Sequence, residues 1–359
     1  MKARRQLLII SICVLLFVAA VGIVVVLRKQ AAPEPARLLP EADAVIYVDL
    51  GTVRNLTAVD QPLPQLAPGY EQFVRETGFS FERDLDEAAM AVHRGSAKAP
   101  AVGSPNGAPN NSARGATRSE TRYTEVLVGH YDPVKLPQYL HQHASSTESY
   151  RGVDVFSFPI ESRTLRVALL AIDTVAVSNV DDPGIIHGII DRFKKVALPF
   201  GGPSLVRTYY RKIPLGSLLW AIAHLPASSN WPNASASFTL PGGIDVGLPG
   251  DCDVVVSLRM LATIHARADF YTQSEQAARQ FTEQTSTFLN LFRGIQSSTN
   301  TGSGDADVKT VLDSIQITQK EDRAELTASI PPSFLRKLIS QPAHDAVQGE
   351  PAPNAPNKK

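Results

Sequence analysis

The segment VDVFSFPIESRTLRVALLAIDTVAVSN, residues 153–179, decides the fold class of this chain. It contains strand-like apolar runs at 153–158, 165–172 and 174–179, separated by short connections. A parallel crossover needs a dozen or more residues, so these connections predict antiparallel pairing. Asp182-Pro183 then begins an amphipathic helix. Its predicted apolar face consists of Ile185, Ile186, Ile189, Ile190 and Phe193.

The same mixture of strand and helix patterns extends towards both ends of the chain. Further strands are predicted at residues 44–50, 88–93, 124–130, 217–224, 235–240, 253–261, 315–318 and 325–330. Further helices are predicted at 71–77, from Leu136, at 272–293 and at 333–339. The expected buried stripe of the 272–293 helix is Ala277, Phe281, Phe288 and Phe292, with Ile295 beyond it. The pattern predicts an α+β fold of antiparallel sheets, with helices on one face and two similar halves.

The N-terminal end is predicted to cross a membrane. Residues 7–27 contain no charged side chain, and at about 1.5 Å per residue they span roughly 31 Å, the thickness of a hydrocarbon core. This stretch is longer than the apolar region of a cleaved signal peptide, and Cys13 lacks the preceding small residue of a lipoprotein signal. Lys2, Arg4 and Arg5 precede the span and indicate a cytoplasmic N-terminus. We therefore expect an uncleaved anchor, with the lipid bilayer contacted through residues 7–27.

Composition divides the remainder of the chain. Two segments contain too few large apolar side chains to offset their ordering entropy by burial, so disorder is expected in both. A short proline-containing stretch after the anchor indicates a stiff spacer. The expected units are a cytoplasmic N-terminus and anchor at 1–29, a spacer at 30–39, a first half at 40–200 with a disordered insertion at 95–118, a second half at 201–340, and a disordered tail at 341–359. The two halves could form one domain or two.

Charge patterning excludes one class of partner. Lys plus Arg and Asp plus Glu number 35 each, but five of the bases lie before residue 30, which leaves 30 bases against 35 acids, a net of −5, in the rest. No nucleic-acid partner is therefore expected, and the stretch VRTYYRK at 206–212 indicates a helix with solvated basic ends. Asp84, Asp86 and Glu87 could act as paired carboxylates, but a solvated turn explains them more simply.

The sequence assigns no catalytic, cofactor-binding or metal-binding residue. The patterns G-x-S-x-G, H-E-x-x-H, the P-loop and a G-x-G-x-x-G after a strand are absent. The glycines of PGGIDVGLPG, residues 241–250, indicate a turn, because no Lys-Ser or Lys-Thr follows them. Cys13 lies in the predicted span and Cys252 lies beyond it, so they cannot pair. Cys252 is expected to be buried, with an intermolecular disulfide as the alternative.

His130, Asp132, His141 and His143 are the strongest candidates for a reactive site. In principle they could bind zinc or copper. Residues two apart on a helix point about 200° away from each other, however, so His141 and His143 would share a metal only if the helix had ended before them. The irregular spacing favours solvated or capping histidines.

Several phrases resemble a family of membrane-anchored extracytoplasmic bacterial proteins that share a domain of unknown function. The phrases are LLPEADAVIYVDL at 38–50, ETGFSFERDLDEAAMAV at 76–92, VLVGHYDPVKLPQYL at 126–140, YRGVDVFSF at 150–158, and LDSIQIT and AELTASIP at 312–318 and 324–331. The resemblance covers most of residues 38–340. It implies a protein of the bacterial envelope and supplies no catalytic residues.

These observations together predict a single-pass protein of the bacterial inner (cytoplasmic) membrane, with a periplasmic or extracellular C-terminal domain. The expected function is non-catalytic binding or assembly, with an envelope protein or component as the partner and no cofactor. One alternative is an envelope hydrolase of unrecognised type, with its site near His130, Asp132, His141 and His143. The other is a carrier that encloses an apolar ligand between the sheet and a helix.

Overall fold

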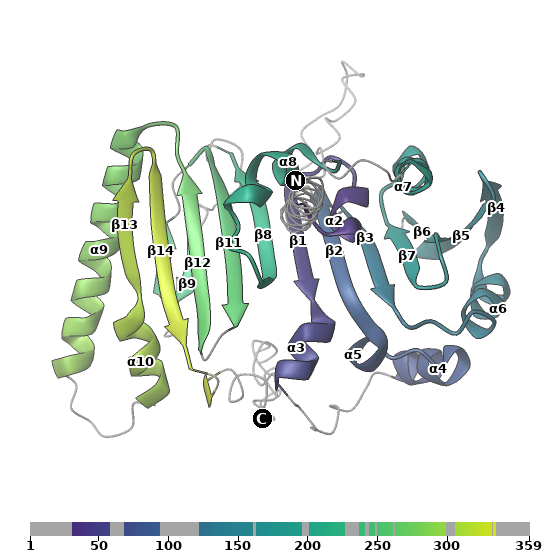
Figure 1. The fold of residues 1–359 in the computed structure, drawn as a ribbon, viewed down its shortest axis with the longest axis horizontal. Coiled ribbons are helices and arrows are strands. Elements are labelled where there is room, and N and C mark those ends of the chain that lie inside the picture. Colours follow the sequence, from purple (N-terminus) through teal and green to yellow (C-terminus); the bar gives the residue numbers. More distant parts are fainter. Residues whose placement is uncertain are drawn as a thin grey trace, which may run out of the picture.

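A single twelve-stranded antiparallel sheet dominates the structure (Figure 1). The computed structural model describes residues 31–57, 68–93, 122–160, 163–195, 201–226, 237–240, 244–247, 250–260, 263–298, 306–331 and 333–334. The strands of the large sheet are β1 Ala44–Asp49, β2 Leu85–His93, β3 Arg122–Gly129, β4 Ser146–Tyr150, β5 Val153–Ile160, β6 Arg163–Leu169, β7 Thr174–Ser178, β8 Ser217–Leu225, β11 Cys252–Met260, β12 Ile264–Tyr271, β13 Gln316–Lys320 and β14 Arg323–Ile330. Their order across the sheet is β13-β14-β12-β11-β8-β1-β2-β3-β7-β6-β5-β4. The predicted α+β class with antiparallel pairing is therefore confirmed.

Helices and one small hairpin complete the described structure. The helices are α2 Glu34–Leu38, α3 Leu50–Thr57, α4 Pro68–Thr77, α5 Phe81–Asp84, α6 Lys135–His143, α7 Gly184–Lys194, α8 Ser204–Tyr209, α9 Glu275–Ser298 and α10 Ala306–Ser314, and a 3-10 turn follows α8 at Tyr210–Lys212. Strands β9 Ser237–Leu240 and β10 Ile244–Gly247 pair separately from the large sheet. The segment at 241–250, predicted as a plain turn, therefore contains a strand.

Helices cover both faces of the large sheet, so the prediction of helices on one face is wrong. Val45 and Tyr47 of β1 mark the first face, where they share a core with α2, α7 and α8. The opposite face carries α6, which packs on β5, β6 and β7, and also α9 and α10, which pack on β12, β13 and β14. The alternation of side chains along each strand allows this, because successive apolar residues in β5 to β7 point to opposite faces.

Strand β1 joins the two expected halves into one continuous sheet. It pairs with β2 on one side and with β8 on the other. At this junction Tyr47 stacks on Trp220 with ring centroids 5.4 Å apart, and Tyr210 packs edge-on against Trp220 at 5.6 Å. Trp220 is only 1% exposed. The junction is therefore part of the core of the molecule.

The expected spacer at residues 30–39 is wrong, because it contains α2 and contributes to the core. Ala36, Leu38 and Leu39 are fully buried. Arg192 of α7 donates a hydrogen bond from Nε to the Leu38 carbonyl at 2.7 Å. The backbone at Gly202 approaches this segment so closely that a Cβ there would lie 3.0 Å from the Cα of Arg37. The prolines near α2 begin a helix that is anchored by its apolar side chains.

The helix predictions hold in outline and differ in detail. In α7 the predicted apolar face is confirmed at Ile186, Ile189 and Ile190, which are fully buried, whereas Ile185 and Phe193 are half-buried. In α9 the predicted stripe is confirmed at Phe281, and it differs from the observed one at other described positions. Its fully buried residues are Ala278, Phe281, Thr285 and Leu289, whereas Ala277 and Phe288 are half-buried, and the side chains of Phe292 and Ile295 lie outside the described set. The buried stripe of α9, Glu275–Ser298, therefore lies beside the predicted one and shares Phe281 with it.

Three predicted segments lie outside the described residues: the membrane span at 7–27, the insertion at 95–118 and the tail at 341–359. Within the described part of the chain, no helix combines the length and apolarity that a bilayer crossing requires. Most of the helix predicted at 333–339 also lies outside this part.

Candidate functional site

The residues singled out in the sequence do not converge. His130 is exposed and its Nδ1 lies 3.1 Å from a carboxylate oxygen of Asp86. On α6, the ring of His141 packs edge-on against Phe156 at 4.7 Å, whereas Nδ1 of His143 lies 2.9 Å from the Tyr139 carbonyl oxygen. No group of three or more His, Cys, Asp or Glu side chains suited to a metal ion occurs in the described ranges.

The acids at the start of β2 have structural partners. Asp84 accepts a hydrogen bond from the Ser80 backbone N–H at 2.8 Å, and its hydrogen bond with Arg83 lowers its pKa despite partial burial. Asp86 pairs with Arg54 at 2.9 Å. Glu87 accepts a hydrogen bond from the Tyr47 hydroxyl at 3.0 Å, while burial raises its pKa. These contacts hold the turn between α5 and β2.

The first face has a second, polar region on the strands beyond β8. The direct cross-strand partner of Tyr47 is Trp220, and that of Trp220 is Ser257. The same row continues through Arg267 to Thr327. Residues directly opposite one another share a face, so the first face changes from apolar to polar where it passes from β8 to β11.

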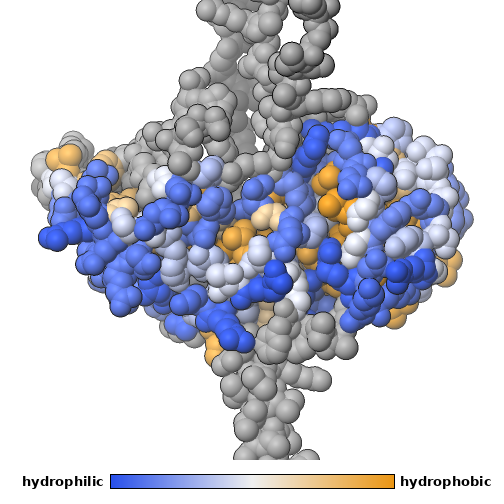
Figure 2. Space-filling view, turned by 90° about the horizontal axis from the view of Figure 1, so that it is seen from above, coloured by the Kyte–Doolittle hydropathy of each residue, from blue (hydrophilic) through white to orange (hydrophobic). Residues whose placement is uncertain are grey.

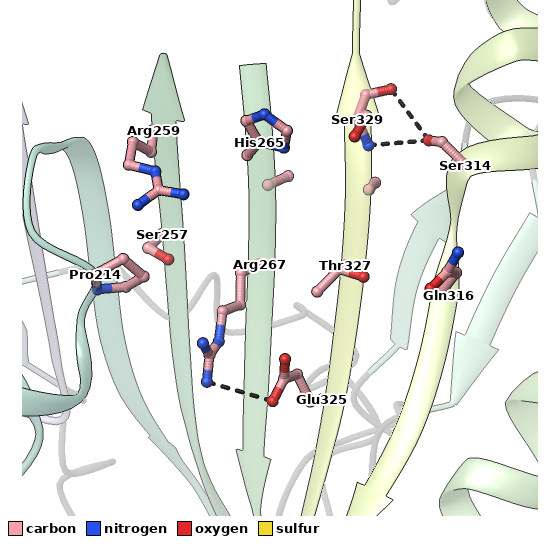
Figure 3. A pocket seen from close by; sticks show the side chains of 12 residues that line it. Pro214, Ser257, Arg259, His265, Arg267, Ser314, Gln316, Glu325, Thr327 and Ser329 are labelled. Carbon is pink, nitrogen blue, oxygen red and sulfur yellow. Dashed lines mark hydrogen bonds and ion pairs between the residues drawn. The ribbon is translucent and has the colours of Figure 1, made fainter. Parts of the chain in front are cut away.

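A pocket of about 410 Å³ lies on this polar part of the first face (Figure 3). It is formed by β11, β12, β13 and β14, and Pro214 from the segment before β8 lies at its edge. Its polar and charged lining consists of Ser257, Arg259, His265, Arg267, Ser314, Gln316, Glu325, Thr327 and Ser329. None of the helices α2, α7 and α8 contributes a residue to this lining. Seen from above, the end of the molecule over β12 to β14 is mostly hydrophilic, and hydrophobic residues gather at the centre and on the side of the first-half strands (Figure 2).

Arg267 is paired with acidic neighbours. Its Nε lies 2.9 Å from Asp269, which is 1% exposed, and its Nη2 lies 3.4 Å from Glu325. Glu325 also contacts Lys320 at 2.8 Å and Arg323 at 3.3 Å. Burial opposes ionisation of Glu325, but these cations outweigh it, so its pKa lies below the usual value. At the lower end of the pocket in Figure 3, Arg267, Lys320 and Arg323 therefore share the two carboxylates of Asp269 and Glu325.

Arg259 has no such partner among the described residues. Its guanidinium makes no hydrogen bond or ion pair with any residue that the structure describes, and its Nε is buried without an acceptor. Its side chain extends along β11 towards Ser257 (Figure 3). Ser257 is 3% exposed, and its hydroxyl has no hydrogen bond to a described residue. At the upper end of the pocket in Figure 3, a buried guanidinium nitrogen of Arg259 therefore lacks an acceptor among the described residues.

This region is absent from the sequence predictions because no strand was predicted at the position of β12. The strand IHARADFY, residues 264–271, alternates apolar residues with His265, Arg267 and Asp269. The alternation is the usual signal of a half-buried strand, and it was available in the sequence. Its polar members were not expected to face a pocket, because no partner strand had been placed beside them.

Cys252 lies at the start of β11 and is 1% exposed. It belongs to the core between the sheet and α9, with Phe270 and Phe281. Burial raises the pKa of the Cys252 thiol to about 12, and the nearby acids Asp253 and Asp251 act in the same direction. The expected role as a buried small side chain fits this environment, and the thiol is not positioned to reach a second molecule.

Comparison with known proteins adds little to this geometry. No family model matches the chain, and no curated protein matches it. Among solved structures, crystal form III of TP0453 is similar with a TM-score of 0.40 and 10% identity, covering 86% of this chain and 98% of that one. Crystal form IV of TP0453 gives a TM-score of 0.41 and 11% identity, covering 87% and 99%. Likeness at this level transfers neither a family nor a function.

Proposed function

We propose that this chain is a single-pass, membrane-anchored protein of the bacterial envelope whose extracytoplasmic domain is a non-catalytic binding or assembly module. The apolar span at 7–27 and the basic residues before it support the anchor and its orientation. The phrases quoted above support membership of the anchored extracytoplasmic family. In this proposal the bilayer holds the protein, and an envelope protein or component is its partner.

The observation that carries the binding role is the polar part of the first face. A sheet normally buries at least one face, and here α9 and α10 bury the opposite face beneath β12, β13 and β14. The first face of these strands therefore needs no cover, yet it presents a pocket with converging charged and hydroxyl side chains. A few convergent polar groups on a rigid scaffold are typical of a binding site.

The two alternatives have less support. The hydrolase site required His130, Asp132, His141 and His143 to come together, and His130 instead pairs with Asp86 while His141 and His143 lie on α6 with other partners. A carrier for an apolar ligand needs an apolar cavity. The 410 Å³ pocket is lined mainly by charged and hydroxyl side chains, and these favour a polar ligand.

Site-specific photo-cross-linking in cells would test the binding surface. A photoreactive residue is placed at Gln316, which is exposed at the pocket, and in a matched control at Gln280, which is exposed on α9. We expect a discrete cross-linked product from position 316 and none from position 280, identified by mass spectrometry. Equal labelling at the two positions, or none at 316, would contradict the assignment of the binding surface.

The anchor is tested separately. The mature protein should retain its first 29 residues, so mass spectrometry of membrane fractions should recover peptides that precede residue 30. Recovery of a soluble form that starts near Ala31 would contradict the anchor and leave the binding surface unaffected.

A further inference from the structure

We propose that the pocket on the first face binds a phosphate group, either as the free ion or as a phosphate ester, through Arg259 and the hydroxyl groups around it. This inference rests on the proposed binding function and names the chemical class of the ligand. It concerns the part of the pocket around Arg259, because Arg267 at the other end already pairs with Asp269 and Glu325.

The two arginines of the pocket differ in their ion-pair partners. Arg267 pairs with Asp269 and Glu325 at 2.9 and 3.4 Å, so its guanidinium already has carboxylate acceptors, which it shares with Lys320 and Arg323. Arg259 faces the same pocket, and no acidic side chain of the described residues pairs with it. An arginine whose Nε is buried without an acceptor has lost hydration without a replacement, which is costly unless a ligand supplies the missing acceptor.

The register of the strands places polar side chains of β11, β12 and β14 next to one another. Arg259 of β11 lies directly opposite His265 of β12, and His265 lies opposite Ser329 of β14. In the next row Ser257 lies opposite Arg267 and, beyond it, Thr327. Direct neighbours across antiparallel strands have Cβ atoms about 4.5–5.5 Å apart, so potential donors from three strands surround one hollow.

The number and kind of donors favour phosphate over a carboxylate. A carboxylate has two acceptor oxygens and is satisfied by one arginine fork. A phosphate group offers at least three strong acceptor oxygens. Here the hydroxyls of Ser257, Thr327 and Ser329, none of which donates to a described residue, line the same pocket as Arg259; Ser257 is on the same strand, and the other two are on β14, beyond β12. That set can satisfy three oxygens from different directions.

A second hollow adjoins this site and could hold the rest of a phosphate ester. It has a volume of about 310 Å³, shares Pro214 with the first pocket, and is lined by Tyr210, Leu215 and Trp220 among others. Ser217 lies in this hollow and is the direct cross-strand partner of Arg259. A phosphate ester whose remaining part is apolar would have room beside the site, and a free phosphate would leave the second hollow empty.

Calorimetric titration of the full-length protein in detergent tests the proposal. The probes are inorganic phosphate and dihexanoyl phosphatidic acid, at fixed ionic strength because salt screens exposed charges. The variants are Arg259→Gln and, as a matched control, Arg279→Gln, which removes an exposed arginine of α9 that pairs with Glu283. We expect the wild type and the control to bind phosphate equally, and Arg259→Gln to bind at least about 10-fold more weakly, the loss of one charge-assisted hydrogen-bond set.

The two probes distinguish the source of the phosphate. Tighter binding of the lipid than of inorganic phosphate would identify a lipid headgroup, and equal binding would identify a free phosphate group. No heat of binding from either probe in the wild type, or unchanged binding in Arg259→Gln, would overturn the proposal. If Arg259→Gln does not fold, Thr327→Val serves in its place, and we expect a several-fold loss with it.

Failure here is distinguishable from failure of the proposed function. If a partner is cross-linked at position 316 but no phosphate binds, the proposed binding surface stands and the proposed ligand class is wrong. Phosphate binding that requires Arg259, together with no cross-linked macromolecule, would reject assembly and retain a small-ligand site.

Discussion

The first face of the large sheet has two regions that differ in cover and in composition. Over β1, β2, β3 and β7 it carries residues such as Val45 and Val126, fully buried beneath α2, α7 and α8. Over β11, β12 and β14 the same face carries Ser257, Arg267 and Thr327, and these line a pocket. The two regions belong to one sheet with continuous register through β1 and β8. The difference is therefore not one of strand geometry.

What differs is where each region obtains its stability. The covered region buries both faces, with α6 on the opposite side at β5 to β7. The polar region buries only its opposite face, against α9 and α10. A sheet that needs only one apolar face leaves the other available for function, so side chains there can be chosen for chemistry rather than for packing.

The largest effect is expected at the junction of the two regions. Trp220→Ala removes a side chain that is 1% exposed and that stacks on Tyr47. Truncation of a buried aromatic residue typically costs about 3–5 kcal/mol through lost transfer energy and the cavity left behind. Urea denaturation should show the full loss in one transition. Two separate transitions, with only one displaced, would indicate that the covered and polar regions unfold independently.

A somewhat smaller effect is expected from the segment once interpreted as a spacer. Leu38→Ala removes a fully buried side chain from the core beneath the first face. Buried Leu→Ala changes cost about 2–5 kcal/mol. The measurement is the urea midpoint, with Arg37→Ala as a nearby variant that removes a half-buried side chain. A loss under about 0.5 kcal/mol in Leu38→Ala would restore the spacer interpretation.

The covered region could be predicted from the sequence to a large extent. The runs at 153–179 and the Asp-Pro helix at 182–193 carry strong periodicity, and their strands and buried isoleucines are where the pattern placed them. Hydrophobic periodicity shows that the apolar side chains of an element share one face, and a core is built from such faces. It gives no information about which face a helix covers, and the helices on both faces were not foreseen.

The polar region could not be predicted in the same way. Its pocket depends on the pairing of β11 with β12 and of β12 with β14, over a sequence separation of about sixty residues between β12 and β14. Arg259, His265 and Ser329 show no motif or spacing of their own, and they lie in one row only because the register places them in neighbouring positions. By contrast, His141 and His143 form a visible pattern in the sequence and yet lie on α6 with separate partners.

Two glutamates sharpen the comparison through opposite responses to pH. Glu125 of β3 lies opposite Met90 and Val177, and burial raises its pKa. Glu325 at the pocket is surrounded by Lys320 and arginines, and its pKa is lowered despite burial. Between the unfolded pKa and a raised folded pKa, the native state holds more protons, so the free energy of unfolding falls as pH rises. With a lowered folded pKa the native state holds fewer protons, and stability is lost as pH falls.

Substitution by neutral glutamine should therefore change the free energy of unfolding in opposite directions at the two positions. At pH 7, Glu125→Gln is expected to raise the free energy of unfolding and Glu325→Gln to lower it, each by less than the core truncations. At pH 4 both differences should shrink, because both glutamates approach protonation in the unfolded chain. Urea midpoints at the two pH values provide the measurement. A decrease in stability for both variants at pH 7 would contradict the pKa shift assigned to Glu125.

The smallest effect is expected in the polar region itself. Thr327→Val keeps the branched shape and the β propensity of the side chain and removes a hydroxyl that has no hydrogen bond to a described residue. The free energy of unfolding should change by less than about 0.5 kcal/mol, as for substitutions away from packed or bonded sites. Thr124→Val in the covered region is the matched comparison. Thr124 is fully buried, lies 3.0 Å from the Ser178 hydroxyl and contacts His93, so its loss leaves a buried hydroxyl with one partner fewer and should cost about 1–3 kcal/mol. If both variants were equally destabilised, Thr327 would have a structural partner, and the first face would be held together by the same means on both sides of the junction.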